Sequence, residues 1–148
     1  MINYYVGDVI KAFLDIKEPV ILIHGCNCFN TMGAGIAKQI KERFPEAYEA
    51  DCKTISGDKN KLGTYTYHQY DNKIIINAYT QYNYSSHKPQ LDYFALGTVL
   101  DQIKQDFPNY KIIMPKIGAG LAGGNWDIIS SIIEQIFPNS IIDVYSLS

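Results

Sequence analysis

The chain has 148 residues and a formal net charge of -2, with a sequence pI near 5.9. This length is typical of one domain that folds without disulfides, so we expect a single domain over residues 1–148. The charge balance excludes a broad basic surface that could hold a nucleic-acid backbone. Cys26, Cys28 and Cys52 make an odd count, and no secretion signal opens the chain, so we expect a cytoplasmic protein. No apolar run approaches the roughly 20 residues that span a bilayer.

Six short segments rich in Ile, Val and Tyr predict strands. In chain order they are residues 2–6, 19–25, 63–70, 73–79, 111–115 and 141–145. The pair Asp71-Asn72 fits a tight hairpin turn between the third and fourth of them. A hairpin of this kind makes one strand pair antiparallel.

Apolar residues recur at helical spacing in most of the longer segments between these strands. Apolar side chains form one stripe at Leu96, Leu100, Ile103 and Phe107, and another at Trp126, Ile129, Ile133 and Ile136. Residues 33–44 and 45–56 predict two further helices, the second opened by a proline. Strands that alternate with helices predict an α/β protein, a three-layer α/β/α sandwich with a mixed, mostly parallel six-stranded sheet.

Two glycine-rich loops each follow a predicted strand and open a helix, at residues 32–38 and 118–124. Glycine lets the main chain approach a ligand closely, and the free amides at a helix start favour negative charge. In open α/β sheets ligands lie at the carboxyl ends of the strands, where both loops are expected. Either loop alone also fits a tight turn, but the pair predicts a site for one diphosphate.

Several other chemistries are disfavoured by the same residues. Residues 118–123 match the dinucleotide fingerprint in form, but only one helix and one strand follow them, too few for a Rossmann domain. Neither loop has the Gly-Lys-Ser/Thr ending of a P-loop, and Cys28 lacks the arginine six residues on that cysteine phosphatases have. His24, Cys26 and Cys28 alternate along one strand face but lack a fourth zinc ligand nearby. We therefore expect neither a metal nor a cofactor.

The chain resembles the macro domain family, whose members bind ADP-ribose through a mixed sheet between two helical layers. The resemblance runs nearly end to end. Within the family it is strongest to the small single-domain branch that includes ADP-ribose 1''-phosphate phosphatases and terminal ADP-ribose protein glycohydrolases. The residues that carry it are Val6-Gly7-Asp8-Val9, His24-Gly25-Cys26-Asn27-Cys28, Met32-Gly33-Ala34-Gly35-Ile36-Ala37, Met114-Pro115-Lys116-Ile117-Gly118-Ala119-Gly120-Leu121 and Asp143-Val144-Tyr145-Ser146-Leu147.

This resemblance implies a set of ADP-ribose-binding positions. Asp8 would accept a hydrogen bond from the adenine amino group, or it would act only as a helix N-cap. Tyr145 would border the adenine, or it would belong to the core. The two loops would hold the diphosphate and the distal ribose, which Asn27 would contact. The full implied set is Gly7, Asp8, Val9, Leu22, Ile23, His24, Asn27, Thr31, Met32, Gly33, Ala34, Gly35, Ile36, Ile117, Gly118, Ala119, Gly120, Leu121, Ala122, Gly123 and Tyr145.

Three side chains are candidates for catalysis. His24 is a candidate because the unperturbed pKa of histidine lies near neutrality and the residue is expected beside the ribose-phosphate end, although it also fits a buried strand histidine. Asn27 would orient water or the departing sugar oxygen, or form a turn. Lys88 lies in a Ser-His-Lys-Pro segment like that of the glycohydrolases, whose lysine attacks the sugar; it also fits a solvated lysine or a phosphate ligand. Those glycohydrolases have an aspartate where this chain has Ala122.

The resemblance therefore implies an enzyme that binds ADP-ribose and removes the terminal phosphate of ADP-ribose 1''-phosphate. One alternative is a glycohydrolase, or O-acetyl-ADP-ribose deacetylase, acting on a modified target, and the other is a reader without catalysis. The expected partner is a small molecule. We expect a monomer with no membrane role, and with nucleic acid only as an ADP-ribosylated target.

Overall fold

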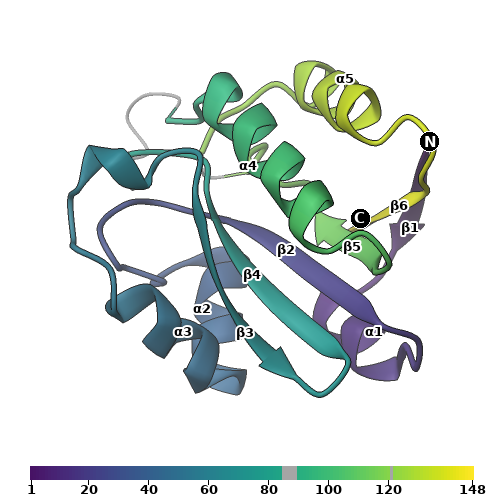
Figure 1. The fold of residues 1–148 in the computed structure, drawn as a ribbon, viewed down its shortest axis with the longest axis horizontal. Helices are drawn as coiled ribbons and strands as arrows, with labels where there is room; N and C mark the ends of the chain where they lie inside the picture. Colours follow the sequence, from purple (N-terminus) through teal and green to yellow (C-terminus); the bar gives the residue numbers. More distant parts are fainter. Residues whose placement is uncertain (85–89, 121) are drawn as a thin grey trace.

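The computed structural model describes residues 1–84, 90–120 and 122–148. Its centre is one six-stranded sheet with the strand order β1-β6-β5-β2-β4-β3 (Figure 1). The strands are β1 (Ile2–Val6), β2 (Val20–Cys26), β3 (Tyr65–Tyr70), β4 (Lys73–Tyr79), β5 (Lys111–Pro115) and β6 (Ile142–Ser146). All six predicted strands are present, within two residues of the expected bounds.

The sheet is mostly parallel, as predicted. Only β3 and β4 pair antiparallel, through a tight turn in which Asp71 adopts a φ of 56°. The pairs β1·β6, β6·β5, β5·β2 and β2·β4 are all parallel. The carboxyl ends of β5, β2 and β4 therefore lie next to one another along one edge of the sheet.

Helices cover both faces of the sheet and complete the predicted three-layer sandwich (Figure 1). One layer contains α4 (Tyr93–Asp106) and α5 (Trp126–Ile136). The other contains α1 (Val9–Asp15), α2 (Gly35–Arg43) and α3 (Pro45–Cys52). Among the described helices, none is both long and apolar enough to cross a bilayer.

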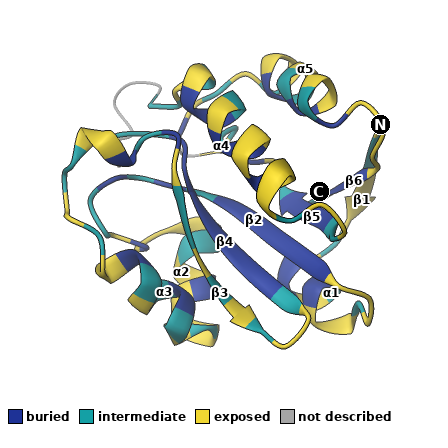
Figure 2. Cartoon of the chain, in the orientation of Figure 1, coloured by how far each residue is buried: buried dark blue, intermediate teal, exposed yellow. Residues whose placement is uncertain are grey.

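Two large apolar clusters, one on each face of the sheet, make up most of the core, and a small third cluster contains Cys26, Cys28 and Tyr79. Alternation along β2 shows the division, because Ile21 and Ile23 pack toward α4 and α5 while Val20 and Leu22 pack toward α1, α2 and α3. Figure 2 shows the central strands buried and the outer surfaces of the helices exposed. A strand buried on both faces reads as a continuous apolar run, which is why β2 was recognisable in the sequence.

Some helical details differ from the expectation. The short helix α1 and a 3-10 helix at Lys59–Lys61 were not predicted. Helix α3 ends at Cys52 rather than at residue 56, because the Thr54 hydroxyl donates a hydrogen bond to the Asp51 carbonyl at 2.6 Å and turns the chain. That early end places the last turn of α3 beside the carboxyl ends of the parallel strands.

Candidate functional site

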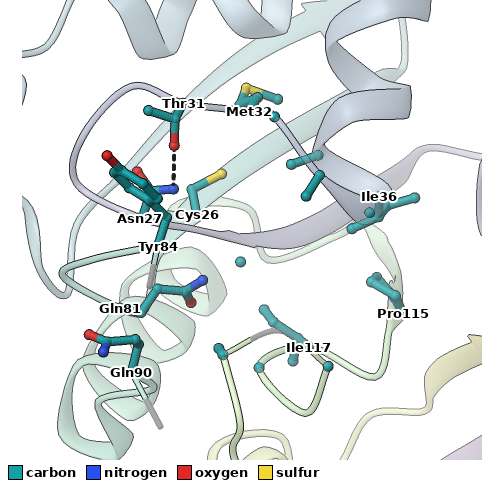
Figure 3. Close-up of a pocket in the computed structure, with 18 of the residues that line it drawn as sticks. Cys26, Asn27, Thr31, Met32, Ile36, Gln81, Tyr84, Gln90, Pro115 and Ile117 are labelled. Carbon is teal, nitrogen blue, oxygen red and sulfur yellow. Dashed lines mark hydrogen bonds between the residues drawn. The ribbon is translucent and has the colours of Figure 1, made fainter. Parts of the chain in front are cut away.

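A cavity of about 600 Å³ lies at the edge of the sheet where the parallel strands end. Its lining includes residues from the loops after β2, β4 and β5, together with Asp51 from α3. In Figure 3, Met32 and Ile36 lie on one wall, and Pro115 and Ile117 lie on the opposite wall. This is the edge at which α/β proteins usually bind ligands.

The first loop leads from β2 into α2 and leaves backbone amides available. Ala34, the N-cap of α2, makes no side-chain capping hydrogen bond, and Gly35 adopts a φ of 57°. Within the described part of the chain, nothing accepts a hydrogen bond from the amides of Gly35 and Ile36. Both residues line the cavity. Free amides at the positive end of a helix dipole are suited to an anion.

Asn27 lies at the start of this loop and holds its shape. Its side-chain Nδ2 donates to Thr31 Oγ1 at 2.8 Å, the bond drawn in Figure 3. Its Oδ1 accepts from the Phe29 amide, also at 2.8 Å. The turn-forming role of Asn27 is therefore observed, and the same side chain lines the cavity.

The second loop leaves β5 and also presents unpaired amides. Gly118 adopts a φ of 76°, and a Cβ at this position would lie 2.8 Å from Leu91 Cδ1. The Gly124 amide donates to the Gly118 carbonyl at 2.8 Å and closes the loop. No described atom accepts from the amides of Gly118 and Gly120, and both residues line the cavity. The two predicted glycine loops thus meet at one cavity from opposite sides.

We expected the start of α5 to add free amides to this set, but it does not. Asn125 is the N-cap of α5, and its Oδ1 accepts from the amides of Asp127 at 2.8 Å and Ile128 at 3.4 Å. The Asn125 side chain therefore already accepts hydrogen bonds from the amides at the start of α5. Only the loop before α5 remains available to a ligand.

The structure brings together a large share of the predicted binding residues. Those that line the cavity are Asn27, Thr31, Met32, Gly33, Ala34, Gly35, Ile36, Ile117, Gly118, Gly120 and Ala122. The predicted residues that are described but do not line it are Gly7, Asp8, Val9, Leu22, Ile23, His24, Ala119, Gly123 and Tyr145. Lys88 and Leu121 lie outside the described residues.

The residues predicted to hold adenine gather beside the cavity lining, near α1. Asp8 is the N-cap of α1, and its Oδ1 accepts from the Ile10 amide at 2.9 Å. Tyr145 stacks on Tyr5 with 5.0 Å between ring centroids, and a Cβ on Gly7 would lie 4.0 Å from the Tyr145 ring. The capping role of Asp8 is therefore observed, while its contact with adenine stays a prediction.

His24 lies inside the sandwich and does not reach the cavity. Its exposed fraction is 0 %, and its Nε2 lies 2.7 Å from Asn77 Oδ1. Burial lowers the pKa of His24 to about 4, although the hydrogen bond with Asn77 opposes this change. A neutral imidazole in this place cannot exchange protons with a ligand directly. The structure thus shows the buried strand histidine, paired with a side-chain amide, and gives no support to His24 as the proton carrier.

Sequence reasoning missed part of the cavity wall. The loop after β4 could have been found, because β4 is a third parallel strand ending at the same edge. Asp51 had no local signal, since only the packing of α3 brings it there. The missed lining residues are Gly25, Cys26, Ala37, Asp51, Gln81, Asn83, Tyr84, Gln90, Pro115 and Lys116.

The cysteines near the cavity are held as neutral thiols. Burial, with a further contribution from the charge of Asp51, raises the pKa of Cys26 well above its usual value. The Cys28 thiol lies 3.6 Å from the Gln81 carbonyl oxygen. Over residues 1–84, 90–120 and 122–148, no three His, Cys, Asp or Glu side chains gather as metal ligands would. The raised pKa values leave Cys26 and Cys28 poorly suited to act as nucleophilic thiolates.

Three curated relatives extend over most of this chain. A protein of Enterobacteria phage T4, the uncharacterized 17.5 kDa protein in the tk-vs intergenic region, is 38% identical over 144 residues, covering 90% of this chain and 88% of its own. The ADP-ribose 1''-phosphate phosphatase of Candida albicans is 28% identical over 156 residues, covering 98% and 99%. The DNA ADP-ribosyl glycohydrolase of Mycobacterium tuberculosis is 30% identical over 142 residues, covering 93% of this chain but only 39% of that relative.

A similar solved structure and a matching family model point to the same group of proteins as these relatives. The macrodomain of Mycobacterium tuberculosis DarG superposes with a TM-score of 0.75 at 24% identity, covering 100% of this chain and 99% of the other. The Macro domain model matches residues 23–133, which include both glycine loops, the strands β4 and β5 and the carboxyl-terminal part of β2. This chain belongs to the macro domain family.

Proposed function

We propose that the protein binds ADP-ribose derivatives and hydrolyses the terminal phosphate of ADP-ribose 1''-phosphate. The observation that carries the proposal is the set of unpaired amides at Gly35, Ile36, Gly118 and Gly120, which belong to two loops on opposite walls of one cavity. A diphosphate has oxygens on both sides and no donor of its own, so it matches this arrangement. The related phosphatase of Candida albicans supports the choice of substrate.

The cavity suggests how the ligand lies. We place the diphosphate between residues 33–36 and 117–120, with the adenine toward Asp8, Val9 and Tyr145. The distal ribose and its phosphate then extend toward Asn27 and the polar residues after β4. In this pose the amides fix the substrate and water attacks the terminal phosphorus, so positioning supplies much of the rate acceleration.

The direct test is phosphate release from ADP-ribose 1''-phosphate by the purified protein. We expect turnover by the wild type and its loss in Gly120→Val, because Gly120 lines the cavity and a Cβ there meets no described atom within 4 Å, so the valine would occupy the cavity without disturbing the described fold. Ser140→Val, at an exposed residue after α5, is the matched control and should keep wild-type turnover.

Other outcomes select the alternatives. The Ser-His-Lys-Pro segment and the Mycobacterium tuberculosis relative favour a glycohydrolase as second candidate. Removal of ADP-ribose from a modified target that is abolished by Lys88→Ala, together with no phosphate release, would replace the phosphatase assignment. Against the lysine mechanism, Ala122 lines the cavity where those enzymes have an aspartate. Binding of ADP-ribose without turnover of either substrate would indicate a reader.

A further inference from the structure

Asp51 is a buried carboxylate that reaches the cavity and that the proposed binding mode leaves unused. It lies in the last turn of α3 with an exposed fraction of 1 %, yet it forms part of the cavity lining together with Cys26. Tyr79 donates its hydroxyl proton to Asp51 Oδ1 at 2.6 Å. In the described part of the chain, this is the only hydrogen bond that the carboxylate accepts. Burying a carboxylate without an ion pair is energetically costly, so a functional role would account for its position.

Behind Tyr79 a chain of hydrogen bonds extends through the sandwich. Tyr79 Oη lies 3.0 Å from Thr66 Oγ1, and Asn77 Nδ2 donates to the same Thr66 oxygen at 3.0 Å. Asn77 Nδ2 also donates to the Ala47 carbonyl at 2.9 Å, which fixes the orientation of the amide because a carbonyl only accepts. Asn77 Oδ1 must then accept from His24 Nε2, at 2.7 Å.

This fixed orientation gives every bond in the chain the same direction. The Thr66 oxygen accepts from Asn77, so its own proton is available to Tyr79, whose proton is directed at Asp51. Each donor therefore points toward the carboxylate, and bonds in series strengthen one another in a buried setting. The arrangement holds Asp51 in one position and stabilises its negative charge. It also gives His24 a positioning role at the far end of the chain.

The electrostatic surroundings of Asp51 suit a base. Burial raises the pKa of its carboxyl above the usual range, while the hydrogen bond from Tyr79 and the positive charge of Lys61 lower it in part. The titratable groups around it are Tyr79 of β4, Cys26 of β2, Cys28, Lys61 and, on its own helix, Tyr48 and Cys52. A carboxylate whose pKa is shifted toward neutrality by burial is typical of a general acid or base.

We propose that Asp51 is the general base of the reaction and that Tyr79, Thr66, Asn77 and His24 position it. The inference rests on the proposed phosphatase function. Asp51 takes one proton from the attacking water as the water oxygen bonds to phosphorus and the bond between phosphorus and the sugar oxygen at C1'' breaks. The protonated carboxyl then returns this proton to the sugar oxygen. ADP-ribose and inorganic phosphate are the products, and Asp51 is regenerated as a carboxylate.

The test compares Asp51→Asn with the wild type on ADP-ribose 1''-phosphate. Asparagine has the same shape and keeps an oxygen that accepts from Tyr79. We expect kcat to fall by roughly 100-fold or more, with KM and the calorimetric affinity for ADP-ribose within about threefold of wild type. Glu49→Gln, an exposed carboxylate on the same helix, is the matched control and should change neither.

A second variant tests the positioning chain. Tyr79→Phe removes the hydrogen bond that lowers the pKa of Asp51, so the acidic limb of the profile of kcat against pH should move to higher pH. A turnover in Asp51→Asn equal to that of the wild type, or a parallel loss of kcat and ADP-ribose binding, would overturn the inference while leaving the phosphatase proposal intact. A wild type that releases no phosphate would overturn both. If Asp51→Asn does not fold, an unmoved acidic limb in Tyr79→Phe rejects the inference.

Discussion

At the level of single residues, buried His24 makes the stability of the fold depend on pH. Its pKa is lowered to about 4 in the folded protein and returns to an ordinary value near 6.5 on unfolding. Between these values the unfolded chain binds the proton more readily, so stability contributed by this residue is complete above about pH 6.5 and is lost as the pH falls toward 4. The loss amounts to roughly 3 kcal/mol.

Urea unfolding at several pH values between 7 and 4 would measure this effect. Asp51 acts in the opposite sense, because a raised carboxyl pKa favours the folded state as the pH falls. Comparing the wild type with His24→Gln cancels the contribution of Asp51, because both proteins keep this residue. We expect the free energy of unfolding to fall less steeply in the variant. Equal slopes for the two proteins would contradict the burial of a neutral His24.

The position of His24 could have been inferred from the sequence more fully than it was. Val20, Leu22 and His24 alternate along one strand and so share a face, and the first two belong to the core beneath α1, α2 and α3. Its partner Asn77 stands opposite it in the neighbouring strand, and strand pairing is not readable from a single sequence. Periodicity indicated the burial, but only the fold shows what satisfies the ring.

At the level of the elements, the helices α1 and α5 depend on similar side-chain caps, of which only the cap of α1 is proposed to contact the ligand. Asp8 caps α1 and Asn125 caps α5, and each side chain accepts from two backbone amides. Replacing either cap with alanine should lower the free energy of unfolding by about 1 kcal/mol, or roughly 2–4 °C in Tm. Asp8→Ala should in addition weaken ADP-ribose binding, whereas Asn125→Ala should not.

Thermal unfolding and calorimetry on the two variants would separate these roles. Asp8→Asn serves as a control, because asparagine is an equally good cap and still offers an oxygen to the adenine amino group. A normal ADP-ribose affinity in Asp8→Ala would leave Asp8 with its structural role alone.

Most elements were predictable because their patterns are local. The bounds of β1, β4 and β5 match the expected segments, and the apolar stripes of α4 and α5 lie in the core as expected. Helix α1 was missed because its seven residues are too few for the apolar period to repeat. The early end of α3 depends on a hydrogen bond from Thr54, which no periodicity reveals.

At the level of the whole molecule, a ligand held by both loops should raise the stability of the entire fold. Binding to the folded state alone contributes about 2.7 kcal/mol at a ligand concentration 100 times Kd. For a chain of this size we expect saturating ADP-ribose to raise Tm by roughly 5–10 °C. Scanning calorimetry would measure the shift. Adenosine, which lacks the diphosphate, should produce a much smaller one, and an unchanged Tm with ADP-ribose would contradict the assignment of the cavity.

The site was predictable where the residues lie in the two glycine loops or directly before them, as Asn27 and Thr31 do. Glycine loops after buried strands have a visible signature, and the strand order brings both to one cavity. Asp51 was not recognisable, because its place in the wall follows from how α3 packs, whereas Gln81 and Tyr84 follow β4 and could have been inferred from the parallel strands. Side chains assembled by tertiary packing leave no local trace in a sequence.

In the proposed site, backbone amides bind the diphosphate and side chains line the rest of the cavity, and this difference affects how such proteins diverge. Every residue except proline carries an amide proton, so under the proposed binding mode the loops around Gly35 and Gly118 would still bind a diphosphate if neighbouring side chains changed. Under the same proposal, the bond that is broken would depend on a few cavity positions such as Asn27 and Asp51. A lineage with this scaffold can therefore exchange one hydrolytic specificity for another through few substitutions, without rebuilding its nucleotide recognition.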